Sequence, residues 1–250
     1  MTTSVSAGPV SPAVPDQNFS PLLSRLAGVI TSPRVTLASV ALEPRWAGVL
    51  IVSFVVMTAC SAALLQTDVG RLALLDQWDR TAVAFGQSVD DAQYAALEEA
   101  SKQGAAYAVI SSLASGPLLT FALSALLFLP FRTALRGAVT YRHVVAIVAH
   151  ASVILALRQF IATPLNYARE SLASPMTMGV FLTMLDEASP VARFFGILDV
   201  FVLWWLAVLA IGMSVLTGRP ARRLLVIFIG AYIVLALLMV IAMAVTGGTA

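Results

Sequence analysis

The chain has 250 residues, of which 59% are hydrophobic and 11% are charged. Soluble domains have about 25% charged residues, so this composition, with a mean hydropathy of +0.90, excludes an ordinary soluble protein and indicates an integral membrane protein. The net charge of +2 does not indicate nucleic-acid binding, because the charges are unevenly distributed along the chain.

The first 45 residues precede any run long enough to cross a membrane. Residues 1–20 have no basic stretch followed by an apolar one, so we expect a disordered tail and no cleavable signal peptide. The pairs Ser20-Pro21 and Ser32-Pro33 are typical of helix starts, and residues 21–45 are predicted to form two amphipathic helices in the membrane interface. Their apolar faces are candidate surfaces for lipid or a partner. The first face is formed by Leu22, Leu26 and Val29, and the second by Val35, Ala38 and Leu42.

Residues 46–245 contain five apolar runs of about 20 residues, the length that crosses a hydrocarbon core of about 30 Å. The runs cover residues 46–66, 107–131, 143–162, 194–217 and 224–245. Strands of alternating polarity, typical of outer-membrane barrels, are absent. The sequence therefore predicts an all-α polytopic membrane protein, a bundle of five transmembrane helices with additional interfacial helices. Gly116-Pro117 interrupts the second run, and interrupted spans often mark substrate sites. Residues 246–250 are expected to form a C-terminal tail.

Two of the connections between runs have apolar patterns of their own. The first connection is amphipathic and predicts two helices on the outer face, the second of which starts at a capping box of Ser88 and Asp91. Residues 175–190 have an apolar part of about a dozen residues, too short to cross the membrane, and we expect them to lie in the outer interface. Flexible methionines make this segment a candidate surface for lipid or a partner. They are Met176, Met178 and Met184.

Charged residues outside the runs differ between the two sides of the membrane. The N-terminal segment and the second and fourth connections carry nine basic and two acidic residues, whereas the other side carries five basic and ten acidic residues. Positively charged loops are retained in the cytoplasm. We therefore expect a cytoplasmic N-terminus and a C-terminus outside.

Four polar side chains within the runs form a candidate intramembrane network: His150, Arg158, Gln159 and Asp199. Arg158 lies about 22 Å along the third helix, and Asp199 lies about five residues into the fourth, which descends from the outside, so both have nearly the same depth. Ionisable groups within a span cost about 2.5 to 3.5 kcal/mol and usually find partners. We expect Arg158 to pair with Asp199, and the alternative is that Arg158 extends to the outer headgroups.

The remaining polar groups suggest no chemistry. His150 either relays protons or, as a neutral ring, bonds to a hydroxyl or carbonyl of a neighbouring helix, and the lack of an acid at its depth favours the bond. His143 and His150 lack further metal ligands, so we expect no metal and no cofactor. Trp204 and Trp205 either line a lipid or ligand groove or fill core space. Motifs of hydrolases, phosphate-binding loops and zinc sites are absent, so we expect no catalytic residues and no enzymatic activity.

Three stretches resemble the bacterial branch of the YIP-one family, membrane proteins related to the eukaryotic Ypt/Rab-interacting proteins. They are "LLSRLAGVITSPRVTLASVALEPRW", "VVAIVAHASVILAL" and "ILDVFVLWWLAVLAIGMSVLTG". The resemblance implies five spans and a cytoplasmic N-terminus, and eukaryotic members bind small GTPases and one another in vesicle traffic. The Asp-Leu-Tyr-Gly-Pro signature of those members is missing here, so small-GTPase binding is not carried over.

The expected function is that of a scaffold or membrane organiser in the bacterial inner membrane, acting through protein partners that include copies of itself. Its expected contacts are membrane lipids and a homo- or hetero-oligomer. The alternative is a transporter or lipid-handling protein whose path follows the polar groups of the third and fourth spans. A hydrated or lipid-filled cavity reaching His150 favours the alternative, and a close-packed bundle favours the scaffold.

Overall fold

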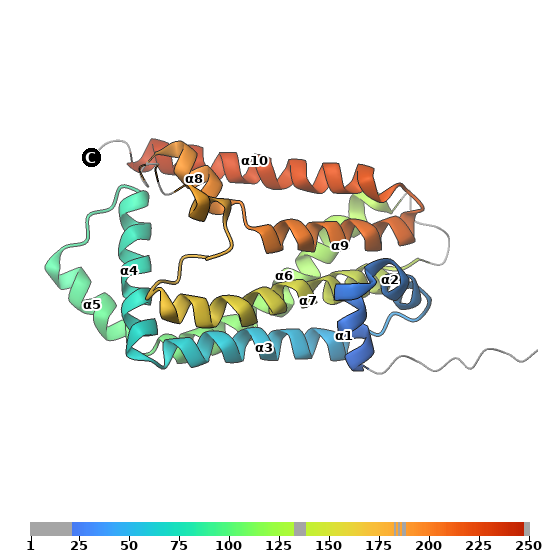
Figure 1. The fold of residues 1–250 in the computed structure, drawn as a ribbon, viewed down its shortest axis with the longest axis horizontal. Helices are drawn as coiled ribbons and strands as arrows, with labels where there is room; N and C mark the ends of the chain where they lie inside the picture. The colour runs from blue at the N-terminus through green and yellow to red at the C-terminus, as the bar shows by residue number, and fades with distance from the viewer. Residues whose placement is uncertain (1–21, 133–138, 183, 185, 187–188, 248–250) are drawn as a thin grey trace, which may run out of the picture.

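The computed structural model describes residues 22–132, 139–182, 184, 186 and 189–247 (Figure 1). The predicted tail of residues 1–20 lies outside the described residues, and so do residues 248–250. Residues 246 and 247 belong to the last helix, so the prediction that they form part of a C-terminal tail is wrong.

Within the described residues, nearly all of the chain is helical. In chain order the elements are α1 (Leu22–Thr31), α2 (Pro33–Leu42), α3 (Ala47–Leu65), α4 (Asp68–Ala84), α5 (Asp91–Ser101), α6 (Gly104–Phe131), α7 (Tyr141–Ala168), the 3-10 turn η1 (Met178–Phe181), α8 (Pro190–Ile197), α9 (Val200–Thr217) and α10 (Ala221–Gly247). Five of them, α3, α6, α7, α9 and α10, are long and apolar enough to cross a membrane. The predicted fold class is confirmed.

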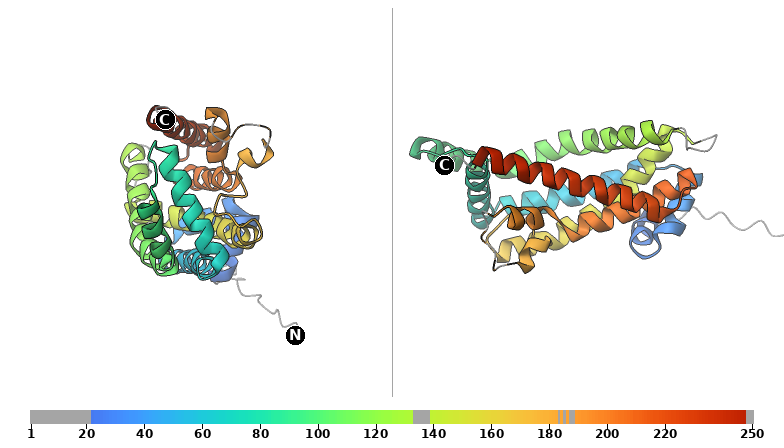
Figure 2. Two further views of the ribbon diagram at one scale, coloured as in Figure 1. Left: turned by 90° about the vertical axis from the view of Figure 1, so that its left-hand side faces the viewer. Right: turned by 90° about the horizontal axis from the view of Figure 1, so that it is seen from above.

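Helix α7 is the central span of the bundle. It packs against α3, α6 and α9, and every residue from Val144 to Ile154 is buried. Alanine is frequent in this stretch, and small side chains allow neighbouring helices to approach closely. The span α10 packs on the other side of α9, so most of its surface, like that of α6, faces outward (Figure 2).

Helices α4 and α5 cover one end of the bundle. Helix α4 lies across the ends of the spans and contacts α3 and α10 (Figure 1, Figure 2). These are the two helices predicted between the first two spans. The capping box of α5 is formed by Asp90 and Gln93. The backbone N–H of Gln93 donates to the Asp90 carboxylate at 2.7 Å, and the backbone N–H of Asp90 donates to the Gln93 side-chain oxygen at 3.3 Å. The predicted capping box of Ser88 and Asp91 is wrong.

At the opposite end, α1 and α2 pack against α7 and α9. Val29 is completely buried, Leu26 packs against the core, and Leu22 is 39% exposed. The prediction that these three residues form one surface for lipid or a partner is therefore wrong for Val29 and Leu26, because α7 extends to this level and packs against α1. On α2 the predicted surface is present, since Val35 is 73% and Leu42 88% exposed.

Helix α6 is continuous through Gly116 and Pro117, so the predicted interruption of the second span is wrong. A span tolerates an internal proline where neighbouring groups satisfy the freed backbone. The glycine instead allows a close contact with α3, because a Cβ at Gly116 would lie 2.8 Å from the Phe54 ring.

Candidate functional site

The candidate site is built around Asp199, which lies between α8 and α9 in extended backbone. Its Oδ1 accepts hydrogen bonds from the N–H groups of Phe201 at 2.8 Å and Val202 at 3.4 Å. These contacts make Asp199 the N-cap of α9. The fourth span therefore starts at Val200, and the prediction that Asp199 lies inside a helix running from Phe194 is wrong.

The other carboxylate oxygen of Asp199 holds two groups from the preceding segments. Arg158 on α7 donates its Nε–H to Oδ2 at 2.7 Å, and the Ser174 hydroxyl donates to the same oxygen at 2.7 Å. The side chain of Asp199 is 4% exposed and that of Arg158 is 28% exposed. A carboxylate has about four acceptor sites, and all of those on Asp199 are occupied. The ion pair expected from the depths of the two residues is present.

The backbone around Asp199 is tied to the connection that follows α7. Thr177 and Asp199 form an isolated antiparallel bridge. Met178 N–H donates to Leu198 carbonyl at 2.8 Å, and Val200 N–H donates to Met176 carbonyl at 3.1 Å. A helix break in a membrane bundle frees backbone groups that need partners. This bridge supplies partners for two of these groups, the Leu198 carbonyl and the Val200 N–H.

Tyr232 connects α10 to the same break. Its hydroxyl donates to the Ile197 carbonyl at 2.5 Å and accepts from the Asp199 N–H at 3.3 Å. We call Asp199, Arg158, Ser174 and Tyr232, with the backbone bridge, the Asp199 clasp. It joins α7, the connection after it, α8, α9 and α10.

The other two polar groups of the predicted network make no hydrogen bond to the clasp among the described residues. His150 is completely buried, and its Nδ1 lies 2.8 Å from the Ala146 carbonyl of its own helix, so Nδ1 carries a proton and donates it. The expected bond to a neighbouring helix is therefore wrong. On the opposite face of α7, Gln159 Nε2 donates to the Ser61 hydroxyl of α3 at 3.1 Å. Among the described residues, no group of three or more His, Cys, Asp or Glu could hold a metal ion.

Two members of the clasp are not indicated by the sequence pattern. Tyr232 has a weak signal, a hydroxyl in the middle of a long apolar run, because such a group needs a partner within the bundle. Ser174 has none, since it is one of many serines in connections and its partner lies 25 residues away along the chain.

The three methionines of the predicted outer surface differ in exposure. Met176 and Met178 are partly buried, because their backbone takes part in the bridge to α9. Met184 is 98% exposed, and Phe181 beside it is 82% exposed. The apolar outer surface is therefore formed by Phe181 and Met184 rather than by all three methionines.

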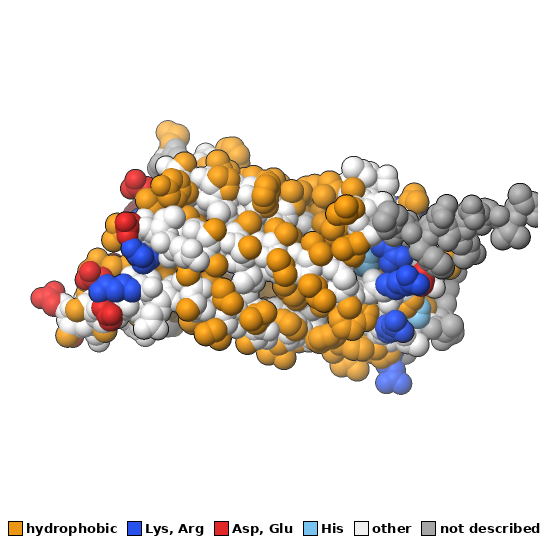
Figure 3. Space-filling model, turned by 90° about the horizontal axis from the view of Figure 1, so that it is seen from below, with side chains coloured by type: hydrophobic (Ala, Val, Ile, Leu, Met, Phe, Trp, Pro, Cys, Tyr) orange, Lys and Arg blue, Asp and Glu red, His pale blue; other side chains and the backbone are white. Residues whose placement is uncertain are grey.

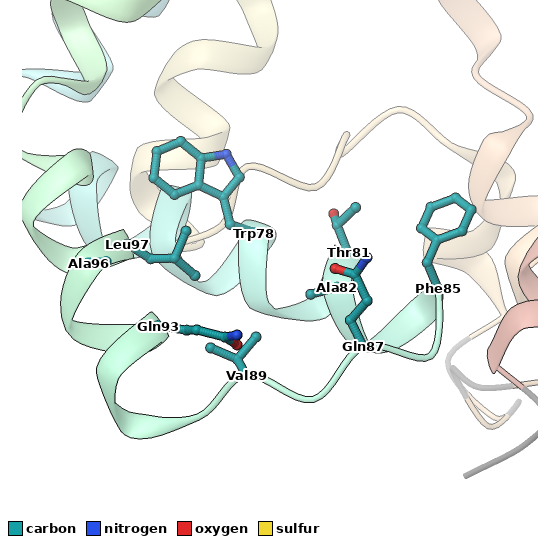
Figure 4. A pocket seen from close by; sticks show the side chains of 9 residues that line it. All are labelled: Trp78, Thr81, Ala82, Phe85, Gln87, Val89, Gln93, Ala96 and Leu97. Carbon is teal, nitrogen blue, oxygen red and sulfur yellow. The ribbon is translucent and has the colours of Figure 1, made fainter.

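Apart from the Asp199 clasp, a pocket lies between α4 and α5 (Figure 4). It has a volume of about 580 Å³, and its lining includes Trp78, Phe85, Gln93 and Leu97. None of the residues that line it carries a carboxylate, an imidazole, a thiol or an amine. The hydroxyl of Thr81 in the lining donates to the Gln77 carbonyl of its own helix, and no base lines the pocket to activate it. The pocket therefore suits an apolar contact.

A family model described as the Yip1 domain matches residues 27–243. The matched region includes the first four spans, the fifth span as far as residue 243, and every member of the Asp199 clasp. No curated protein and no solved structure matches the chain. The match covers most of the chain, so this protein belongs to the Yip1 domain family.

Proposed function

We propose that this integral membrane protein is a non-enzymatic scaffold or membrane organiser that acts through protein partners, including copies of itself. The observation that carries the proposal is the internal use of the charged groups in the spans. Arg158 and Asp199 bond to each other, and the carboxylate also caps α9. This ion pair holds helices together, and Asp199 has no acceptor site left for a transported cation.

The second candidate function is transport or lipid handling along α7 and α9. A path through the centre of the bundle is disfavoured at His150, because this residue and its neighbours from Val144 to Ile154 are buried. Two cavities border α7 within the part of the chain that the structure describes, and neither is lined by His150.

A scaffold needs surfaces that its own bundle does not use. Leu23, Val35 and Leu42 are apolar and between 73% and 88% exposed at one end of the bundle. Phe181 and Met184 are exposed at the other end. Exposed apolar patches of this kind mark interaction sites, so these two surfaces are the proposed contacts with partners.

The proposed location is the bacterial inner membrane, with a cytoplasmic N-terminus and the C-terminus outside. In support, acidic side chains with some basic ones among them lie at one end of the molecule, whereas mostly basic side chains are seen at the opposite end (Figure 3). Basic flanks are retained on the cytoplasmic side. The five candidate spans among the described residues support this arrangement, because an odd number of crossings separates the two chain ends.

Site-specific photo-crosslinking in cells tests the scaffold. A photoreactive residue at Val35 or Leu42 should give discrete protein adducts, including adducts with other copies of the chain, because these side chains point away from the bundle. The matched control is Val234 on α10, which is 55% exposed but lies within a span and should contact lipid. Purification of a monomer, with no protein adducts from Val35, Leu42 or Met184, would overturn the proposal.

A further inference from the structure

Two cavities follow one another along the same pair of helices, α3 and α7. The α7 residues that line them recur at intervals of three and four, which places them on one face of the helix. They are Val148, Ser152, Leu155, Gln159, Ala162 and Asn166, and Arg158 joins them in one of the two cavities from the side of this face. On α3 the lining residues have the same spacing, and include Phe54, Thr58, Ser61 and Leu65. We call this pair of stripes the α3–α7 seam.

The upper cavity lies beside the Asp199 clasp and is polar. Its volume is about 150 Å³, and its lining includes Arg158, Gln159, Asn166 and Ser174. This volume corresponds to about five water molecules at roughly 30 Å³ each, so it fits a small polar group and not a whole ligand. The cavity lies at the level of Asp199, where α9 begins, and hence near the headgroups on that side of the membrane.

Two side chains in the upper cavity have unused hydrogen-bonding capacity. Asn166 is 8% exposed, and its Oδ1 is buried without a partner among the described residues. Arg158 has five N–H donors, and only the one on Nε bonds to a described protein group. Buried polar groups in native proteins nearly always have partners, so Asn166 Oδ1 points to a ligand with a donor. The Arg158 side chain is 28% exposed, so its remaining N–H groups are open to a ligand with acceptors.

The lower cavity lies deeper in the spans and is apolar. Its volume is about 440 Å³, within the range of roughly 300 to 1,000 Å³ for ligand cavities. The hydroxyls of Ser115, Thr120 and Ser152 bond to carbonyl groups of their own helices, so they offer little to a polar ligand. Leu119, on the α6 side of the lining, is 65% exposed, so the cavity reaches the lipid-facing surface there.

Trp205 supplies one buried donor to the lower cavity. Its Nε1 has no partner among the described residues. Trp205 lies six residues after Asp199, about 9 Å deeper along α9 at 1.5 Å per residue. A ligand in the seam therefore meets a polar level, then a single N–H group, and then an apolar space.

We propose that the α3–α7 seam binds one glycerophospholipid whose headgroup carries a hydrogen-bond donor. The phosphate accepts from the free N–H groups of Arg158, and the headgroup amine or hydroxyl donates to Asn166 Oδ1. An ester oxygen accepts from Trp205 Nε1, and one acyl chain occupies the lower cavity. The order of groups along the seam matches that along a phospholipid entering from the bilayer. The site does not depend on the scaffold function and would hold a lipid with or without protein partners.

The proposal predicts a preference between headgroups. Phosphatidylethanolamine and phosphatidylglycerol have a donor for Asn166, whereas phosphatidylcholine has none. Protein purified in mild detergent, stripped of lipid and supplied with each of the three in turn should retain one lipid per chain by native mass spectrometry. Retention should be about tenfold greater for the first two, as expected for one hydrogen bond to a buried group.

Two variants and a control assign the binding to the seam. Asn166→Leu should lower retention of phosphatidylethanolamine to the level of phosphatidylcholine. Leu119→Trp changes an exposed side chain at the edge of the lower cavity, leaves folding intact, and should lower retention of all three lipids. Thr163→Ala lies on α7 between the same levels but outside both linings, and should change nothing.

Equal retention of the three lipids by the parent protein, no retained lipid, or unchanged retention in both Asn166→Leu and Leu119→Trp would overturn the proposal. These outcomes leave the scaffold unaffected, because that function is tested by protein adducts at Val35 and Leu42.

Discussion

At the scale of single residues, Asp199 has two structural functions that a simple ion pair does not require. One oxygen starts α9, and the other holds Arg158 and Ser174. Replacing a buried ion pair by apolar residues is often neutral, but removing one partner leaves an uncompensated charge. The clasp is therefore expected to specify where α9 begins more than to add net stability.

A double-mutant cycle tests the ion pair. Arg158→Met and Asp199→Asn should each lower the free energy of unfolding by about 2 to 4 kcal/mol, slightly below the range for fully buried pairs because Arg158 is partly exposed. The double variant should lose less than the sum, with a coupling energy of about 1 to 3 kcal/mol. Unfolding in mixed micelles measures all three.

The control for this cycle is Arg169→Met, since Arg169 is exposed at the end of the same helix; a surface change of this kind should shift stability by at most about 0.5 kcal/mol. If the double variant lost as much unfolding free energy as the two single variants together, the ion pair between Arg158 and Asp199 would contribute nothing to stability.

At the scale of helices, the contact between α7 and α9 depends on a missing side chain. A Cβ at Gly212 would lie 2.3 Å from Ile147 Cγ2 and 3.3 Å from Leu37 Cδ1. Both neighbours are completely buried and have little room to move. Small residues at such positions allow backbones to approach in membrane bundles, so Gly212 fixes the distance between the two helices.

Gly212→Ala should destabilise the protein by about 1 to 3 kcal/mol, the cost of overpacking a filled core. Gly230→Ala is the matched control, because nothing lies within 4 Å of a Cβ at this position of α10. In the control, alanine should leave stability unchanged or raise it by up to about 1 kcal/mol through helix propensity. Thermal unfolding in detergent compares the two, and equal midpoints would contradict a close contact at Gly212.

At the scale of the whole molecule, the two ends of the bundle differ in sequence and in structure. Basic segments and the docked helices α1 and α2 form one end, whereas α4, α5 and the acidic residues form the other. This polarity supports a single orientation in the membrane.

Reporter fusions at Ala13 and after Ala250 test the orientation. Five spans and a cytoplasmic N-terminus should give cytoplasmic signal from the first fusion and external signal from the second. Each site is fused in turn to two reporter enzymes, one active only in the cytoplasm and one active only outside. Whichever side the site occupies, one of the two reporters should then give a signal. Signals from the same side would mean that the number of spans is wrong.

Much of this architecture could be predicted because it follows from single helices. Twenty apolar residues must cross the bilayer, and a fixed rise per residue sets Arg158 and Asp199 at one depth. The break before α9 could not be predicted, since residues 194–217 read as one apolar run and a cap depends on three-dimensional contacts. The burial of Val29 was missed for a related reason, because an apolar face does not reveal whether lipid or another helix covers it.

The break before α9 shortens this span and so affects the thickness of the bilayer around the protein. The span α9 has 18 residues and α3 has 19, so at 1.5 Å per residue both are about 27 to 29 Å long. The spans α7 and α10, with 28 and 27 residues, are about 40 Å long. Short spans match a hydrocarbon layer slightly thinner than the usual 30 Å or so, whereas long ones accommodate by tilting. The protein should therefore thin the membrane locally on the α3 and α9 sides and partition toward thinner bilayers.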